Sequence, residues 1–102
     1  MRRLYDLAYG RSGDKGNIAN VSVIARTPDD YAEIKTKLTA ERVKTFYGDL
    51  ITGDVIRYEL DNIEALNFVL YDALDGGATR SLRIDLLGKS LAGILLSMEW
   101  DT

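Results

Sequence analysis

Strands and helices alternate along the chain, and this order predicts an α+β sandwich with helices on one face of a mixed sheet. Apolar residues recur at every second position in Ile18–Arg26 and Arg80–Leu86, which is typical of half-buried strands. Helical spacing of apolar residues follows Thr27 and Thr39, which suit N-cap positions. The expected order is β-β-α-α-β-α-β-β, with about five strands, in a single domain over residues 1–102.

The composition excludes several classes of site. The chain has no cysteine and no histidine, which excludes a cysteine nucleophile, a Ser-His triad and the usual structural zinc sites. We therefore expect neither a metal nor another cofactor. The net charge of −3 argues against non-specific binding to nucleic acid, which needs a basic face.

The sequence also predicts where the protein resides. No apolar run reaches the roughly 18 residues that a membrane span requires. Asp6 interrupts the apolar residues after the basic start Met1-Arg2-Arg3, so this end is unlike a secretion signal. The absence of cysteine fits a reducing compartment, and we expect a cytoplasmic protein that does not associate with membranes.

The first half of the chain is expected to hold three strands and two helices. Leu4–Tyr9 and Ile18–Arg26 are predicted to be strands on either side of a loop, Gly10–Asn17, which has glycines at a spacing of three. Pro28 suits the first position of the helix that Thr27 caps, and the helix after Thr39 is expected to end near Leu50. A further strand is predicted over Asp54–Leu60.

The second half is expected to hold one helix and two strands. Asp61-Asn62 would cap a helix over Ile63–Leu74, and Gly76-Gly77 would end it. Strands are predicted over Arg80–Leu86 and Leu91–Trp100, with a turn between them.

Some apolar residues of these elements would lie on surfaces. Phe68 falls on the polar side of the expected helix, either as a ring partly buried against a loop or as part of a partner surface. The outer face of the sheet is expected to include Ile18, Ile24, Leu91 and Leu95. A two-layer sandwich leaves this face to water or to another chain, so we expect a homo-oligomer.

The glycine-rich stretch is the main candidate site. It is not a Walker A motif, because Lys15 precedes Gly16 instead of following it, and it is not G-x-G-x-x-G. Backbone amides beside glycines can form an anion-binding nest, which suits an acyl-CoA phosphate or a carboxylate. The alternative is a purely structural hairpin loop. The candidate ligand-binding residues of this stretch are Arg11, Ser12, Gly13, Gly16 and Asn17.

Two charged pairs add further candidates. Asp14 and Lys15 would act as a catalytic acid–base pair if burial moved their pKa values toward neutrality. Otherwise Asp14 accepts backbone amide bonds and Lys15 pairs with a carboxylate. Arg80 and Arg83 either bind an acidic ligand or partner, or belong to an ion-pair ladder across strands.

Amide and phenol side chains are weaker candidates. Asn17, Asn20 and Asn67 lie near apolar runs, where such residues satisfy local backbone groups or orient a substrate carbonyl. Tyrosines such as Tyr9 and Tyr58 are more typical of core or rim aromatics than of catalysts.

Several segments together resemble one small domain family. They are Arg11–Asn17, Asn20-Val21, Arg57–Leu60, Ala65–Leu70, Gly76-Gly77, Arg80–Arg83 with Asp85, and Gly88-Lys89. The chain resembles the AtuA-like ferredoxin-fold domain, which occurs at the C-terminal end of acyclic terpene utilisation proteins and as a separate small polypeptide. The resemblance covers nearly the whole chain, which looks like the stand-alone form because no large domain precedes it.

The resemblance implies a ferredoxin-like two-layer sandwich and a role beside a larger AtuA-type protein. That larger protein is associated with the breakdown of citronellol- and geraniol-type compounds as CoA thioesters. "Ferredoxin" here denotes a fold, because a chain without cysteine cannot hold an iron–sulfur cluster in the usual way.

Three hypotheses about function follow. In the first, the chain is an accessory subunit or domain of an AtuA-type assembly in acyl-CoA or terpenoid-acid catabolism, and its glycine-rich loop contributes to a ligand or interface site. In the second, it is an independent lyase or hydratase that uses Asp14 and Lys15. In the third, it is a homo-oligomeric binding module without catalysis.

Overall fold

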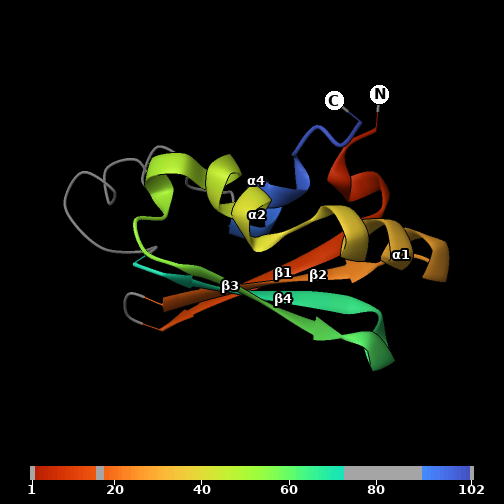
Figure 1. The fold of residues 1–102 in the computed structure, drawn as a ribbon, viewed down its shortest axis with the longest axis horizontal. Coiled ribbons are helices and arrows are strands. Elements are labelled where there is room, and N and C mark those ends of the chain that lie inside the picture. The colour runs from red at the N-terminus through yellow and green to blue at the C-terminus, as the bar shows by residue number, and fades with distance from the viewer. Residues whose placement is uncertain (1, 16–17, 73–90, 102) are drawn as a thin grey trace.

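A computed structural model describes residues 2–15, 18–72 and 91–101, which form two layers (Figure 1). The sheet has four antiparallel strands in the order β1-β2-β4-β3. Its strands are β1 (Ala8–Lys15), β2 (Ile18–Ala25), β3 (Val55–Leu60) and β4 (Ala65–Tyr71). The helices are α1 (Pro28–Lys37), α2 (Ala40–Tyr47) and α4 (Leu91–Leu96), and all three cover the same face.

The α+β sandwich with helices on one face is therefore confirmed, but the sheet differs from the expected one. The described residues contribute four strands to it, where five were expected, and every pairing is antiparallel, so the sheet is not mixed. The reason is that hairpins connect β1 to β2 and β3 to β4, and antiparallel neighbours need only short connections. The expected strand over Arg80–Leu86 lies outside the described residues.

The N-terminal strand is displaced from its predicted position. Leu4–Asp6 forms a 3-10 turn in which the Asp6 carboxylate accepts a bond from the Arg3 backbone N–H at 2.8 Å. Strand β1 begins only at Ala8 and pairs with β2 up to Lys15, opposite Ile18. Most of the stretch that was expected to be a loop is thus an edge strand, and only residues 16 and 17 separate β1 from β2.

The helices after β2 begin where the sequence predicts. The Thr27 hydroxyl accepts a bond from the Asp30 N–H, and the Thr39 hydroxyl accepts one from the Arg42 N–H, each at 3.0 Å. Helix α2 ends at Tyr47, and a 3-10 turn over Gly48–Leu50 continues it to the expected end.

The predicted helix over Ile63–Leu74 is wrong, because this segment contains the central strand β4. Leu66, Phe68 and Leu70 alternate toward the helices and are fully buried. Strands β2 and β3 pair with both edges of β4, which satisfies its backbone groups as well as a helix would. Phe68 therefore belongs to the core and not to a partner surface.

The predicted strand over Leu91–Trp100 is also wrong. Leu91–Leu96 forms helix α4, in which Ala92 and Leu95 are buried at helical spacing against β1 and β2. Leu91 and Leu95 are consequently in the helical layer, and of the four residues expected on the outer face of the sheet only Ile18 and Ile24 lie there.

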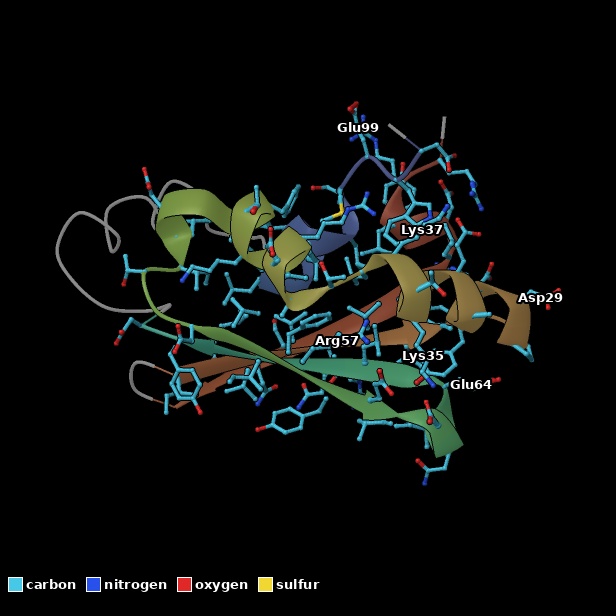
Figure 2. All side chains as sticks on the ribbon, in the orientation of Figure 1. Asp29, Lys35, Lys37, Arg57, Glu64 and Glu99 are labelled. Carbon is cyan, nitrogen blue, oxygen red and sulfur yellow. The ribbon has the colours of Figure 1, made fainter. Side chains whose placement is uncertain are left out.

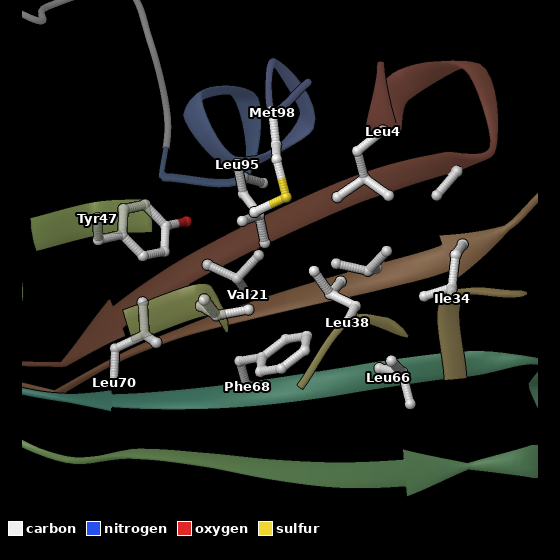
Figure 3. Close-up of a cluster of buried hydrophobic side chains, with 14 of the residues drawn as sticks. Leu4, Val21, Ile34, Leu38, Tyr47, Leu66, Phe68, Leu70, Leu95 and Met98 are labelled. Atoms are coloured by element: carbon white, nitrogen blue, oxygen red, sulfur yellow. The ribbon is translucent and has the colours of Figure 1, made fainter. Parts of the chain in front are cut away.

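The core fills the space between the sheet and the helices (Figure 3). Phe68 is its largest fully buried side chain. The other core residues labelled in Figure 3 are Leu4, Val21, Ile34, Leu38, Tyr47, Leu66, Leu70, Leu95 and Met98.

The two ends of the chain lie side by side at the helical layer (Figure 1). Arg3 and Glu99 form an antiparallel bridge, and the Trp100 N–H donates to the Arg2 carbonyl at 2.9 Å. The Arg2 guanidinium also pairs with both Asp101 and Glu33 at 2.8 Å, which ties the two ends to α1.

Candidate functional site

Strand alternation divides the glycine-rich stretch between the two faces of the sheet. Gly10 faces α4: a Cβ atom added there would lie 2.9 Å from Leu96 Cδ1 and 3.2 Å from Ala92 Cβ. Such distances are too short for an ordinary side chain, so glycine at this position allows the helix to approach the strand.

Gly13 lies on the opposite face and has no comparable internal reason to be glycine. A Cβ atom there would meet only the Asn20 side-chain oxygen, at an ordinary 3.8 Å. Its backbone is not left-handed either, because Gly48 is the only described glycine with positive φ. The backbone at Gly13 is therefore bare on a surface where a side chain would fit.

We call the sheet face away from the helices the open face; its side chains project away from the helical layer (Figure 2). The strand register arranges it in four rows, three of which cross the sheet from β1 to β3. The rows are Tyr9–Ile24–Ala65–Leu60, Arg11–Ser22–Asn67–Tyr58, Gly13–Asn20–Val69–Ile56, and Ile18–Tyr71 beside the end of β1.

One of these rows is polar. The Ser22 hydroxyl lies 3.3 Å from the Asn67 side-chain oxygen, to which it donates. Arg11 at the β1 edge is exposed and makes no ion pair with a described residue, and Tyr58 at the β3 edge is 51% exposed. Arg11, Gly13 and Asn20 together form a small polar area at the β1 edge of the open face.

The sequence-predicted site residues fall into three groups. Arg11, Ser12 and Gly13 are exposed on β1, with Arg11 and Gly13 on the open face and Ser12 at the position between them. The backbone at positions 14 and 15 completes β1 opposite Ala19 and Ile18. The remaining candidates lie outside the described residues and stay predictions: Gly16, Asn17, Arg80 and Arg83.

The family can now be stated from a comparison that covers nearly the whole chain. The family model of the AtuA ferredoxin-like domain matches residues 2–101. The chain belongs to the AtuA ferredoxin-like domain family. This confirms the resemblance found in the sequence, and with it the ferredoxin-like fold. Searches of the curated proteins and of the solved structures found no match.

The sequence reasoning about this AtuA ferredoxin-like domain missed part of the open face. Ser22 was not considered. Asn67 and Tyr58 were not connected to Arg11, because both lie more than 40 residues after it in the sequence. The signal that was available is the alternation in Asp54–Leu60, which places Ile56, Tyr58 and Leu60 on one face. Only the pairing of β3 with β4 shows that this face is the open one.

A charged cluster between α1 and β3 joins the helical layer to the sheet. Figure 2 shows Lys35 and Arg57 there. Arg57 donates to the carbonyls of Lys35 and Leu38 at 2.8 and 3.0 Å, which satisfies the C-terminal end of α1. The Tyr31 hydroxyl donates to Asp61 at 2.5 Å, and Lys35 pairs with the same carboxylate at 3.0 Å.

The pKa shifts in the domain are those of structural contacts. Burial and the bond to Asp61 raise the pKa of Tyr31 to about 12, and Tyr31 with Lys35 lowers the pKa of Asp61. Arg2 lowers the pKa of Asp101 to about 2. Among the described residues every resolved shift moves away from neutrality, which is the opposite of what a general acid or base at neutral pH requires.

Other features of the described residues do not add to the site. An open groove of about 700 Å³ lies between α2 and the segment after α4, with Arg42, Phe46 and Met98 in its lining, and none of the site residues predicted on β1 lines it. No cluster of three or more potential metal ligands occurs in the described ranges. Within those ranges no helix has the length and apolar character to cross a membrane.

Proposed function

We propose that this AtuA ferredoxin-like domain is an accessory component of an AtuA-type assembly in acyl-CoA or terpenoid-acid catabolism. Membership of the family supports a link to the larger AtuA-type protein. In the proposal, the hairpin of β1 and β2 contributes to a site for an anionic ligand at an interface with that protein.

The bare backbone at Gly13 beside the exposed Arg11 is the observation that carries the proposal. A strand backbone without a side chain admits close approach by a ligand or another chain. A guanidinium that pairs with no described carboxylate suits a carboxylate or phosphate ligand, which it can bind with two parallel hydrogen bonds. The Asn20 amide, opposite Gly13, adds a donor and an acceptor for a carbonyl group.

The experiment is to fill the bare position and to measure both kinds of binding. Gly13→Leu places aliphatic bulk over the strand, and Ala32→Leu adds the same bulk at an exposed position of α1 as a matched control. Each variant is co-purified with a co-expressed AtuA-type protein, and each is titrated calorimetrically with an acyl-CoA thioester and with a short carboxylic acid.

We expect Gly13→Leu to weaken binding at least about tenfold, the effect of a single well-placed obstruction of roughly 1.4 kcal/mol, and Ala32→Leu to leave it unchanged. The proposal fails if the unaltered domain neither co-purifies with the larger protein nor binds either compound. It also fails if Gly13→Leu binds as well as the control.

The alternative of an independent lyase or hydratase rests on Asp14 and Lys15 and remains a prediction. Its test is the turnover of the isolated domain after Asp14→Asn and after Lys15→Met. Unchanged turnover in both variants would remove this alternative, and loss of turnover in both would favour it over the accessory role.

A further inference from the structure

The open face is a surface of the domain that no described element covers. It exposes large apolar side chains on all four of its strands: Tyr9 is 55% exposed, Tyr58 51%, Ile18 43%, Ile56 40% and Tyr71 39%. Apolar side chains gathered in this way mark an interaction surface.

We propose that the open face packs against the open face of a second copy of this chain, about a two-fold axis that runs along the strands between β2 and β4. The polar area of Arg11 and Gly13 would then be completed by the β3 strand of the second copy. This role as a shared site rests on the proposed function, whereas the pairing of the two faces does not.

The strand register makes the open face complementary to itself under this axis. The order β1-β2-β4-β3 places β1 over β3 of the second copy and β2 over β4 of the second copy, and each row faces its own counterpart. A symmetric interface requires this property, because the same patch must serve both subunits.

The contacts that result are chemically matched. Arg11 faces Tyr58 of the second copy, where a guanidinium can lie over an aromatic ring. The bare backbone of Gly13 faces Ile56 of the second copy, and Ser22 faces Asn67 of the second copy. Apolar residues of the outer rows face one another in the same way.

The charges favour this axis over the other symmetric arrangement. Arg11 is the only charged residue at the row positions whose side chains are described; just beyond the rows, Arg26 lies with its guanidinium 4.0 Å from the centre of the Tyr9 ring. Charged residues are depleted in interface cores. A two-fold axis across the strands would instead stack β1 on β1, which brings both Arg11 side chains to one edge without a carboxylate. The axis along the strands separates them to opposite edges.

The size of the face is close to what a specific pair of chains requires. Four strands about 4.8 Å apart and seven paired positions about 3.4 Å apart give roughly 450 Å² of projected face per copy. Two copies present about 900 Å² before the relief of the side chains is included, and specific interfaces begin near 1,000 Å² of accessible area. Two sheets of this kind pack face to face with their strands nearly aligned.

The first test is the mass of the isolated chain in solution, measured by analytical ultracentrifugation. We expect a dimer for the unaltered protein. Tyr58→Glu should raise its dissociation constant about 30-fold or more, because it replaces an aromatic contact with Arg11 of the second copy by a buried charge. Phe46→Glu, at a 36% exposed aromatic residue of α2, is the matched control and should leave the dimer intact. A monomer at about 100 μM for the unaltered chain, or a dimer that Phe46→Glu disrupts and Tyr58→Glu does not, would overturn the proposal.

The second test uses the absence of cysteine from the chain and does not depend on destabilising a variant. Chains carrying Arg11→Cys are mixed with chains carrying Tyr58→Cys and treated with a short bismaleimide crosslinker. We expect the mixture to give crosslinked dimers and each variant alone to give few. Efficient crosslinking of Arg11→Cys alone would show an axis across the strands and contradict the arrangement.

Failure of the second-copy proposal can be told apart from failure of the proposed function. A monomeric chain that still co-purifies with an AtuA-type protein, and loses it after Gly13→Leu, would overturn the second-copy proposal and leave the accessory role standing. A dimer with the expected crosslink that binds neither the larger protein nor an acyl-CoA thioester would do the reverse.

Discussion

Gly10 and Gly13 lie three residues apart on one strand and lack a side chain for opposite reasons. Gly10 makes room for α4, whereas the space beside Gly13 on the open face is unoccupied by any described side chain but Asn20. A glycine-rich stretch in a sequence therefore mixes residues needed for packing with residues that leave a surface bare, and only the pairing register separates the two.

This difference predicts opposite effects of the same substitution. Gly10→Ala should lower the free energy of unfolding by about 1–3 kcal/mol, because its Cβ would crowd Ala92 Cβ, which moves only with the backbone of α4. Gly13→Ala should leave that free energy unchanged or raise it by up to about 1 kcal/mol, since alanine loses less entropy than glycine on folding. Urea denaturation of both variants measures the effect, and a larger loss for Gly13→Ala than for Gly10→Ala would contradict it.

At the scale of elements, the helix starts are predictable because their chemistry is local. Thr27 and Thr39 bond to backbone groups three residues away, so the sequence around each threonine contains the whole interaction. Strand β4 and helix α4 are different, because each of their sequences fits two periods. Leu66, Phe68 and Leu70 alternate as in a strand, but Leu66 and Leu70 are also four apart as on a helix.

What decides between the two periods lies elsewhere in the chain. Strand β4 is a strand because β2 and β3 are available on both of its edges. Helix α4 packs against β1, where its small residue Ala92 fits beside the bare Gly10. Neither partner can be read from the segment itself, so the sequence alone could not settle these two elements.

The cap of α2 gives a prediction at this scale. Thr39→Ala removes the bond to the Arg42 N–H and should lower the free energy of unfolding by about 1 kcal/mol. Thr45→Ala, at an exposed position within the same helix, should change it by less than about 0.5 kcal/mol, because alanine is the better helix former. The two variants are compared by denaturation in urea; equal losses would show that Thr39 does not act as a cap.

For the whole molecule, the charged contacts predict how stability depends on pH. Asp101, Glu33 and Asp61 have folded pKa values below their ordinary ones, so their contribution is present above the unfolded pKa values near 4 and is lost as the pH falls. The fall should extend to about pH 2, the pKa of Asp101. Tyr31 acts in the opposite sense: its raised pKa gives stability that is present below pH 10 and lost as the pH rises toward about 12.

Melting temperatures recorded from pH 2 to pH 12 check this profile. Between about pH 5 and 9 stability should change little, because the chain has neither histidine nor cysteine. Asp101→Asn should flatten part of the fall on the acid side, whereas Asp49→Asn, at an exposed residue with no ion pair among those described, should not. An acid limb that is identical in the two variants would be evidence against the role of Asp101.

The candidate site was predicted from the sequence only in its position along the chain. The stretch Arg11–Gly13 was recognised because its glycines and charges are adjacent, but it was expected in a loop, and its neighbours on the open face come from β2, β4 and β3. Asn67 lies beside Ser22, and Tyr58 beside Asn67, through two strand pairings that no local pattern encodes.

The fastening of the two chain ends has a practical consequence for how the domain can be handled. Arg2, Arg3, Glu99 and Trp100 hold both ends on the side of the helices, away from the open face (Figure 1). An affinity tag, a fluorophore or a tether added at either end therefore does not cover the open face. A domain anchored by one end to a sensor surface would keep the anchor away from the sheet, so that the anchor does not obstruct the surface on which both proposals depend.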